Sequence, residues 1–189
     1  DMGRTVSESR LFRTDLAGGA ILDVGLYPIS FSRLIAGAAL GKKFINPKTI
    51  TGRAKIGETQ VDEISYATLQ FENGIIAEAA TAIRKEMKNN AIIEGTKGII
   101  EIDQPWTVGK EGGPYHSTFK IFIKDQIETI DFKGPEHLFF FEAELASKAI
   151  LQEKTEITYP GMTWEDTLGN LKTLDEWRKS IGYSLPQDS

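Results

Sequence analysis

An almost uninterrupted apolar run begins at Gly18 and continues to about Ala36. Its length and periodicity predict a helix that is apolar on nearly every side, and such helices are buried. Only one carboxylate, Asp23, and one phenol, Tyr27, interrupt the early part of the run. Because these residues are four apart, an α-helix would place them one turn apart on the same face. Pro28 lies inside the run and predicts a kink, because proline lacks the amide donor that a helix interior needs.

The middle of the chain shows the alternation of polar and apolar positions that is typical of strands. Asn73-Gly74 is its strongest hairpin signal. Short turns also join most of the other strands, so neighbouring strands should be largely antiparallel, since parallel neighbours need long crossovers. The predicted strands are Thr49–Ile56, Glu63–Phe71, Ile75–Ile83, Ala91–Glu94, Gly98–Ile102, Phe119–Ile123 and Ile127–Phe132.

Two helices are predicted after the strands. The first covers His137–Gln152 and contains Phe139-Phe140-Phe141, which we interpret as core residues. The second begins with Thr163 and Asp166, whose spacing resembles a capping box, and should stop near Gly182. Its predicted buried stripe consists of Trp164, Leu168, Leu171 and Leu174.

Strands in the middle and helices at both ends predict an α+β fold, with a predominantly antiparallel, open-faced sheet and helices on one face. The other face would be bare in a monomer. It would expose either Ala67, Leu69 and Phe71 or else Ile64 and Tyr66. An uncovered face with large apolar residues indicates an interface, and we therefore expect a homodimer.

The start of the chain offers two candidate anion ligands. Residues Val6–Phe12 read as a strand, with Arg10 and Arg13 near its end. Two interpretations of the arginines stay open: a solvated strand edge, or contacts to a substrate anion or a nucleotide phosphate.

Composition limits the possible functions. The 189 residues fit one domain, and 40% hydrophobic and 26% charged residues are ordinary for a globular protein. A net charge of −5 argues against nucleic-acid and acidic-membrane partners. The chain has no cysteine, and its two histidines are too few and too far apart to indicate a metal site, so we expect no metal. With no membrane span or signal peptide visible, we expect a cytoplasmic protein.

The string Gly-Gly-Ala-Ile-Leu-Asp-x-Gly-x-Tyr-Pro-Ile-Ser-x-x-Arg-Leu-Ile-x-Gly, which begins at Gly18, closely resembles the signature helix of the glucose-fructose oxidoreductase / inositol dehydrogenase (Gfo/Idh/MocA) family. It is most similar to the dihydrodiol dehydrogenase and NADP-dependent sugar dehydrogenase branch, in which the second site residue is Tyr rather than His. The final stretch from Met162 to Gly182 is similar to the last helix of that branch. Asp1-Met2-Gly3-Arg4 is similar to the link between the two domains of these enzymes.

The resemblance implies that residues 1–189 are a single C-terminal domain for substrate binding and dimerisation. No Gly-x-Gly-x-x-Gly unit occurs in the chain, so the N-terminal dinucleotide-binding domain should be absent. The implied partners are that missing domain, a small carbohydrate-like substrate and a second copy, which family members bind through the open sheet face. NAD or NADP would belong to the full-length protein, and none is expected on this domain alone. The sequence does not identify cofactor-binding residues.

Hydride transfer to or from a nicotinamide needs a group that moves the proton of the alcohol. A phenol ionises near pH 10 unless a cation lies beside it. The resemblance implies that Tyr27 is the proton donor or acceptor, that Asp23 orients the substrate, and that the cation is a lysine of a Glu-Lys-Pro motif on the missing domain.

Two hypotheses remain. The chain is either the substrate half of an NAD(P)-dependent oxidoreductase acting on a sugar, polyol or cyclic diol, or a non-catalytic binding or assembly module with the same fold. The pair Asp23 and Tyr27 discriminates between them, because a scaffold has little reason to hold a carboxylate in an apolar helix. A structural carboxylate that is simply hydrogen-bonded is the alternative interpretation of the pair.

Overall fold

The computed structural model describes residues 9–108 and 113–188. These residues divide into two compact units, one drawn from 1–87 and 162–189 and the other from 88–161. Every strand pairing in the described residues is antiparallel, which confirms the predicted α+β class. The strands form two sheets rather than one, with orders β1-β2-β3 and β4-β5-β6-β7. The expectation of a single domain over 1–189 stays a prediction.

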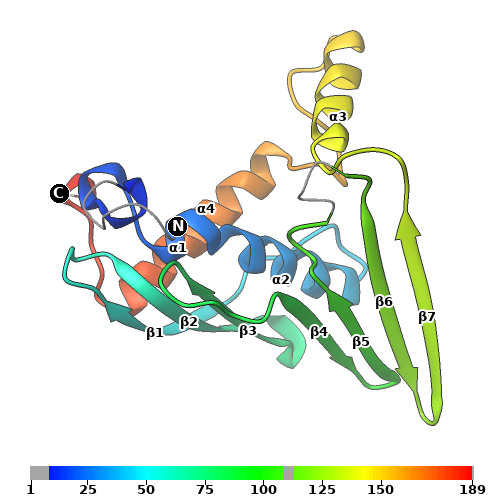
Figure 1. The fold of residues 1–189 in the computed structure, drawn as a ribbon, viewed down its shortest axis with the longest axis horizontal. Coiled ribbons are helices and arrows are strands. Elements are labelled where there is room, and N and C mark those ends of the chain that lie inside the picture. Colours follow the sequence, from blue (N-terminus) through cyan, green and yellow to red (C-terminus); the bar gives the residue numbers. More distant parts are fainter. Residues whose placement is uncertain (1–8, 109–112, 189) are drawn as a thin grey trace. The chain divides into compact units, whose positions relative to one another are not determined.

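The first unit places helices on one face of its three-stranded sheet (Figure 1). The buried face of the central strand carries Ala67, Leu69 and, just after the strand, Phe71, and these pack with Trp177 of the last helix. The indole N–H of Trp177 donates to the carbonyl of Tyr66 at 3.1 Å, which ties the last helix to the sheet. The elements are α1 (Ala20–Val24), α2 (Leu26–Ala39), β1 (Thr49–Ile56), β2 (Asp62–Gln70), β3 (Ile76–Ala82) and α4 (Trp164–Ser180).

No described helix of the first unit lies on the opposite face of this sheet (Figure 1). Because side chains alternate along a strand, burial of Ala67 and Leu69 directs Tyr66 and Thr68 to the open face. Of the two alternatives considered from the sequence, the open face is therefore the one that carries Tyr66, and not the one that carries Leu69. The Arg53 guanidinium lies over the Tyr66 ring, 4.7 Å from its centroid. A hollow of about 660 Å³ follows this face and is lined by Thr51, Gly52, Arg53, Tyr66, Ala67, Thr68, Glu78, Ala79 and Ala80.

The apolar run forms two helices instead of the single kinked helix expected. The break lies at Gly25, whose N–H bonds to the carbonyls of Ala20 and Ile21. Pro28 lies in the first turn of α2, three residues after this break, and the helices Thr14–Val24 and Leu26–Ala39 are bent by 41° there, which confirms the bend expected from Pro28. In the described part of the chain no single helix is long and apolar enough to cross a membrane; only the bent pair 14–24 and 26–39 meets that test, and only jointly.

The start of the described chain also differs from the sequence prediction. Residues 10–12 form a short 3-10 helix, η2 (Arg10–Phe12), and not a strand, while 6–8 lie outside the described residues. The side chain of Ser9 accepts the N–H of Leu11 at 3.4 Å, which is a helix-start contact and not a strand pairing. A second 3-10 helix, η3 (Thr14–Leu16), follows before α1.

The last helix, α4, confirms the predicted cap but not the predicted buried stripe. The Thr163 hydroxyl accepts the N–H of Asp166 at 3.2 Å, as a capping box requires. Of the predicted stripe only Leu174 is buried, whereas Trp164, Leu168 and Leu171 are exposed. The buried face instead carries polar residues whose partners lie inside the unit. Asn170, Thr173 and Arg178 are buried there together with Leu174 and Trp177.

The second unit contains a four-stranded sheet and one helix. The three phenylalanines expected in the core, Phe139-Phe140-Phe141, are all exposed, so that prediction is wrong. Consecutive helical residues point about 100° apart, and one helix face cannot bury all three. Phe141 makes an edge contact with Tyr115, with ring centroids 5.3 Å apart. The elements are β4 (Asn90–Gly95), β5 (Gly98–Asp103), β6 (His116–Ile123), β7 (Gln126–Lys133) and α3 (Phe140–Leu151).

Candidate functional site

Two adjacent glycines allow the chain before α1 to pack tightly against the start of that helix. The Gly18 N–H donates to the backbone carbonyl of Arg13 at 2.8 Å, and the Gly19 N–H donates to the backbone carbonyl of Leu11 at 2.9 Å. A Cβ atom on Gly18 would lie 2.6 Å from the Leu11 carbonyl oxygen and 2.7 Å from that of Arg10. No larger residue fits at this position, so the first glycine sets where η2 lies.

The second glycine makes room for a buried carboxylate at the start of α1. Gly19 has φ +111°, and a Cβ there would lie 2.1 Å from Asp62 Oδ1. Asp62 Oδ2 accepts the N–H of Ile21 at 2.9 Å and the hydroxyl of Ser65 at 2.7 Å. The carboxylate is fully buried, and this burial raises the pKa of Asp62 against the effect of its hydrogen bonds. Asp62 thus anchors the helix that carries Asp23.

Asp23 forms an ion pair with Arg10, which the sequence interpretation did not foresee. A guanidinium nitrogen of Arg10 lies 2.6 Å from Asp23 Oδ1. The Asp23 side chain is 16% exposed and that of Arg10 is 69% exposed, so the pair lies at the rim of the apolar helix. The carboxylate therefore has the partner that a charge in an apolar helix needs.

Tyr27 lies just beyond the helix break and is 51% exposed. It is the second residue of α2, whereas Asp23 belongs to α1. The two side chains are thus carried by different helices that meet at Gly25, and the four-residue spacing alone does not determine how they face each other. The assignment of Asp23 and Tyr27 as site residues stays a prediction.

The other arginine near the start, Arg13, has a different partner. Its guanidinium forms two contacts with Asp15, at 2.5 and 3.0 Å, and this cation lowers the pKa of Asp15. Both side chains are well exposed. The two arginines thus have different surroundings, because Arg10 pairs with a carboxylate of the signature helix and Arg13 pairs with its own neighbour.

A buried arginine of α2, Arg33, was also missed by the sequence interpretation. One of its guanidinium nitrogens lies 2.5 Å from Asp166 Oδ1 and also donates to Asn170, while Nε donates to Asn46 at 3.0 Å. The side chain is fully buried, and this burial lowers the pKa of Arg33 although Asp166 opposes the effect. The available signals were an arginine within an apolar run and its place in the signature string. Arg33 joins α2 to α4 and so supports the helix that carries Tyr27.

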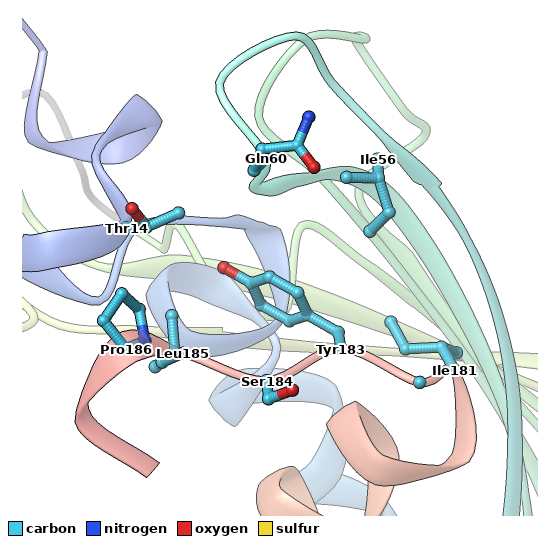
Figure 2. A pocket seen from close by; sticks show the side chains of 9 residues that line it. Thr14, Ile56, Gln60, Ile181, Tyr183, Ser184, Leu185 and Pro186 are labelled. Carbon is cyan, nitrogen blue, oxygen red and sulfur yellow. The ribbon is translucent and has the colours of Figure 1, made fainter. Parts of the chain in front are cut away.

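Two cavities formed by described residues of the first unit lie away from the candidate residues. One cavity of about 440 Å³ is formed by the segment after α4, where the Tyr183 ring extends toward Thr14 and Gln60 (Figure 2). Burial raises the pKa of the Tyr183 phenol to about 12. Neither this cavity nor the hollow on the open sheet face includes Asp23 or Tyr27 in its lining. These two residues therefore lie on a surface outside both hollows.

Comparisons with known proteins agree with the signature string. Residues 2–101 match the family model described as GFO/IDH/MocA C-terminal domain. The trans-1,2-dihydrobenzene-1,2-diol dehydrogenase of Mus musculus is 27% identical over 175 residues, which cover 91% of this chain and 49% of the relative. That of Xenopus laevis is 34% identical over 184 residues, covering 94% of this chain and 51% of the relative. The chain thus spans about half the length of these relatives.

A solved structure shows the same fold. It is a 3-ketoreductase from Actinomadura kijaniata in complex with NADP and TDP-benzene. The match has a TM-score of 0.74 at 22% identity and covers 92% of this chain and 49% of the ketoreductase.

Proposed function

Since this chain belongs to the GFO/IDH/MocA family through its C-terminal domain, we propose that it is the substrate-binding and oligomerisation half of an NAD(P)-dependent oxidoreductase. The substrate would be a sugar, polyol or cyclic diol. The relatives named as dihydrodiol dehydrogenases support an alcohol substrate, and the NADP held by the ketoreductase supports a nicotinamide cofactor. The chain's coverage of about half of each relative supports a second domain that binds the nucleotide.

The observation that carries the proposal is the surface where α1 meets α2. A half-exposed phenol, Tyr27, follows four residues after an ion-paired carboxylate, Asp23, and the start of the helix that carries Asp23 is anchored to Asp62. The phenol can donate a proton to a reacting oxygen, or accept one from it, while remaining in contact with solvent. Asp23 can accept a hydrogen bond from a substrate hydroxyl and so orient it.

The nicotinamide would supply the hydride, and this chain would supply position and proton transfer. The residues present do not form a dinucleotide cradle, because the sequence has no Gly-x-Gly-x-x-Gly unit after a strand. The residues that read the ribose belong to such a unit, and the proposal therefore covers NAD and NADP alike. A cytoplasmic location remains part of the proposal.

The test is Tyr27→Phe in the enzyme that contains this chain together with its nucleotide-binding domain. Loss of a proton-transfer group costs about 10²-fold or more in kcat, and the Kd for the nicotinamide cofactor should stay unchanged. Tyr159→Phe makes the same chemical change in the second unit and serves as the control. Unchanged turnover of Tyr27→Phe would overturn the assignment and favour the non-catalytic module.

The open face of the β1-β2-β3 sheet is proposed as the dimer interface. Its central residues Tyr66 and Thr68 are flanked by Ala80 and lie on a hollow that a second copy could fill. Sedimentation should show a dimer at micromolar concentration, and Thr68→Arg should convert it to a monomer because it places an unpaired charge in the interface. A clean monomer of the unaltered chain at that concentration would count against this interface.

A further inference from the structure

The cavity formed by the segment after α4 lies apart from the surface that carries Asp23 and Tyr27. Three parts of the first unit meet around it: the 3-10 helix η3, the turn between β1 and β2, and the segment that follows α4 (Figure 2). Its volume of about 440 Å³ falls in the range that small-molecule sites of proteins occupy. The chemistry of its lining therefore indicates what kind of molecule it could hold.

The polar side chains of this lining offer hydrogen bonds without a charge. Hydroxyls come from Thr14, Tyr183 and Ser184, and an amide comes from Gln60. None of the described lining residues is charged at neutral pH. The rest of the wall is mainly aliphatic and includes Ile56, Ile181 and Leu185. Such a lining matches a neutral molecule that has several hydroxyls and one apolar face.

Tyr183 is the residue that indicates a ligand. It is only 8% exposed, and its hydroxyl has no hydrogen-bond partner among the described protein atoms. The ring extends toward Thr14 and Gln60 (Figure 2). Because buried polar groups nearly always have a partner, an unpaired phenol beside a cavity indicates that its partner comes from outside the chain. The side chains of Gln60 and Ser184 are exposed, so they can turn aside and let a ligand reach the covered hydroxyl.

The charges around the phenol disfavour an anionic ligand. The carboxylate of Asp62 raises the pKa of Tyr183 more than the guanidinium of Arg178 lowers it, and Asp188 also raises it. The electrostatic potential at the phenol is therefore negative. A carboxylate or phosphate in the cavity would be repelled, and it would meet no cation among the described lining residues.

We propose that this cavity is a binding site for a neutral pyranose sugar. A sugar oxygen accepts the Tyr183 hydroxyl, Thr14 and Gln60 bind further sugar hydroxyls, and the C–H face of the ring rests on the aliphatic wall. Asp23 and Tyr27 do not line this cavity, so it is distinct from the candidate site. The inference does not depend on the proposed function.

Saturation-transfer NMR on the chain of residues 1–189 tests the site, with methyl α-D-glucopyranoside as the probe. The native chain should show saturable binding with a Kd of about 10 mM or less, because a few neutral hydrogen bonds and a small apolar contact give weak affinity. Tyr183→Phe removes the donor and keeps the ring, and it should raise this Kd about fivefold. Thr14→Val removes a hydroxyl at nearly constant volume and should also raise the Kd. Thermal unfolding of both variants detects any folding defect separately.

Tyr66→Phe is the matched control, because Tyr66 lines the hollow on the open sheet face and not this cavity. Tyr27→Phe is the control for the candidate site. Both should leave the Kd unchanged. D-Glucuronate should bind at least about fivefold more weakly than the neutral probe, since its carboxylate meets the negative potential at the phenol.

Three outcomes would overturn the inference. The first is the absence of saturable binding to the native chain, and the second is an equal Kd in the native chain and Tyr183→Phe. The third is weaker binding in Tyr66→Phe or Tyr27→Phe but not in Tyr183→Phe, which would place the sugar on another surface. Turnover of Tyr27→Phe in the whole enzyme tests only the oxidoreductase assignment, so the two proposals fail separately.

Discussion

Asp62 and Ile21 are joined by a hydrogen bond of 2.9 Å that ties the first residue of β2 to the first turn of α1. The acceptor is a fully buried carboxylate and the donor is one of the N–H groups that a helix start leaves unpaired. Asp62 therefore does for α1 what an N-cap side chain does for other helices, but from a strand 41 residues away. Because α1 carries Asp23, this bond connects the stability of the first unit to the candidate site.

Asp62→Ala should destabilise the chain by about 2–4 kcal/mol. The change removes the acceptor for Ile21 and for the Ser65 hydroxyl, and leaves both donors buried without a partner. Urea unfolding followed by circular dichroism measures the loss. Asp62→Asn keeps one acceptor oxygen and should lose less; an Asn variant as unstable as the Ala variant would show that the hydrogen bonds are not the cause.

Gly19→Ala should be among the most destabilising single-methyl changes in the chain, by about 3 kcal/mol or more. The new Cβ would lie 2.1 Å from Asp62 Oδ1, and the residue has φ +111°, which L side chains rarely adopt. Gly41→Ala is the control, because Gly41 has φ +68° and no atom within 4 Å of its Cβ position. That variant should lose only about 1 kcal/mol. Similar losses would mean that the Asp62 contact is unimportant.

Arg33→Ala should cost about 3–5 kcal/mol in the free energy of unfolding. It leaves Asp166 without its cation and opens a cavity between α2 and α4. Arg13→Ala removes an exposed ion pair of similar length and should change stability far less, because solvent screens that pair. The comparison separates buried from exposed pairing, and equal effects would contradict the role given to Arg33.

Stability should depend on the Tyr183 phenol at alkaline pH. Its pKa is raised to about 12 in the folded chain, while an unfolded phenol ionises near pH 10. The folded state therefore keeps the proton longer, and the stability that this difference contributes is full below about pH 10 and is lost as the pH rises through about 12. Between pH 9 and 11.5 the native chain should lose stability relative to Tyr183→Phe. Parallel pH curves for the two proteins would contradict this.

At neutral pH the same variant should be as stable as the native chain or slightly more stable. The Tyr183 hydroxyl is buried and has no hydrogen-bond partner among the described protein atoms. Removal of an unpaired buried polar group relieves its desolvation cost.

Local sequence patterns were enough for the seven strands predicted in the middle of the chain and for the antiparallel class, but not for the strand predicted at Val6–Phe12. Thr49–Ile56 was predicted with both ends as the structure has them, because its alternation and its flanking turns are local signals. The capping box at Thr163 was likewise found, since its two residues are three apart. The bend in the apolar run was predicted from Pro28, but the break at Gly25 was not, because glycine is tolerated in helices and marks no certain break.

The buried face of α4 could not be deduced from its pattern of apolar residues. The sequence favoured Trp164 and Leu168, and the structure buries Asn170 and Arg178. Polar residues can occupy an interior only when their partners are present, and the partner of Asn170 is Arg33, which is 137 residues away in the chain. A pattern within one helix carries no information about such a partner.

The sequence by itself determined the family, the antiparallel α+β architecture and the two candidate residues Asp23 and Tyr27, since these depend on residue types at short spacing. Only the tertiary structure decided what those residues contact. Arg10 meets Asp23, and Asp62 holds Ile21, because two glycines let the chain fold back closely enough for the charges and donors to pair. Pairing energy depends on the distance between groups in space, and the order of residues does not specify that distance.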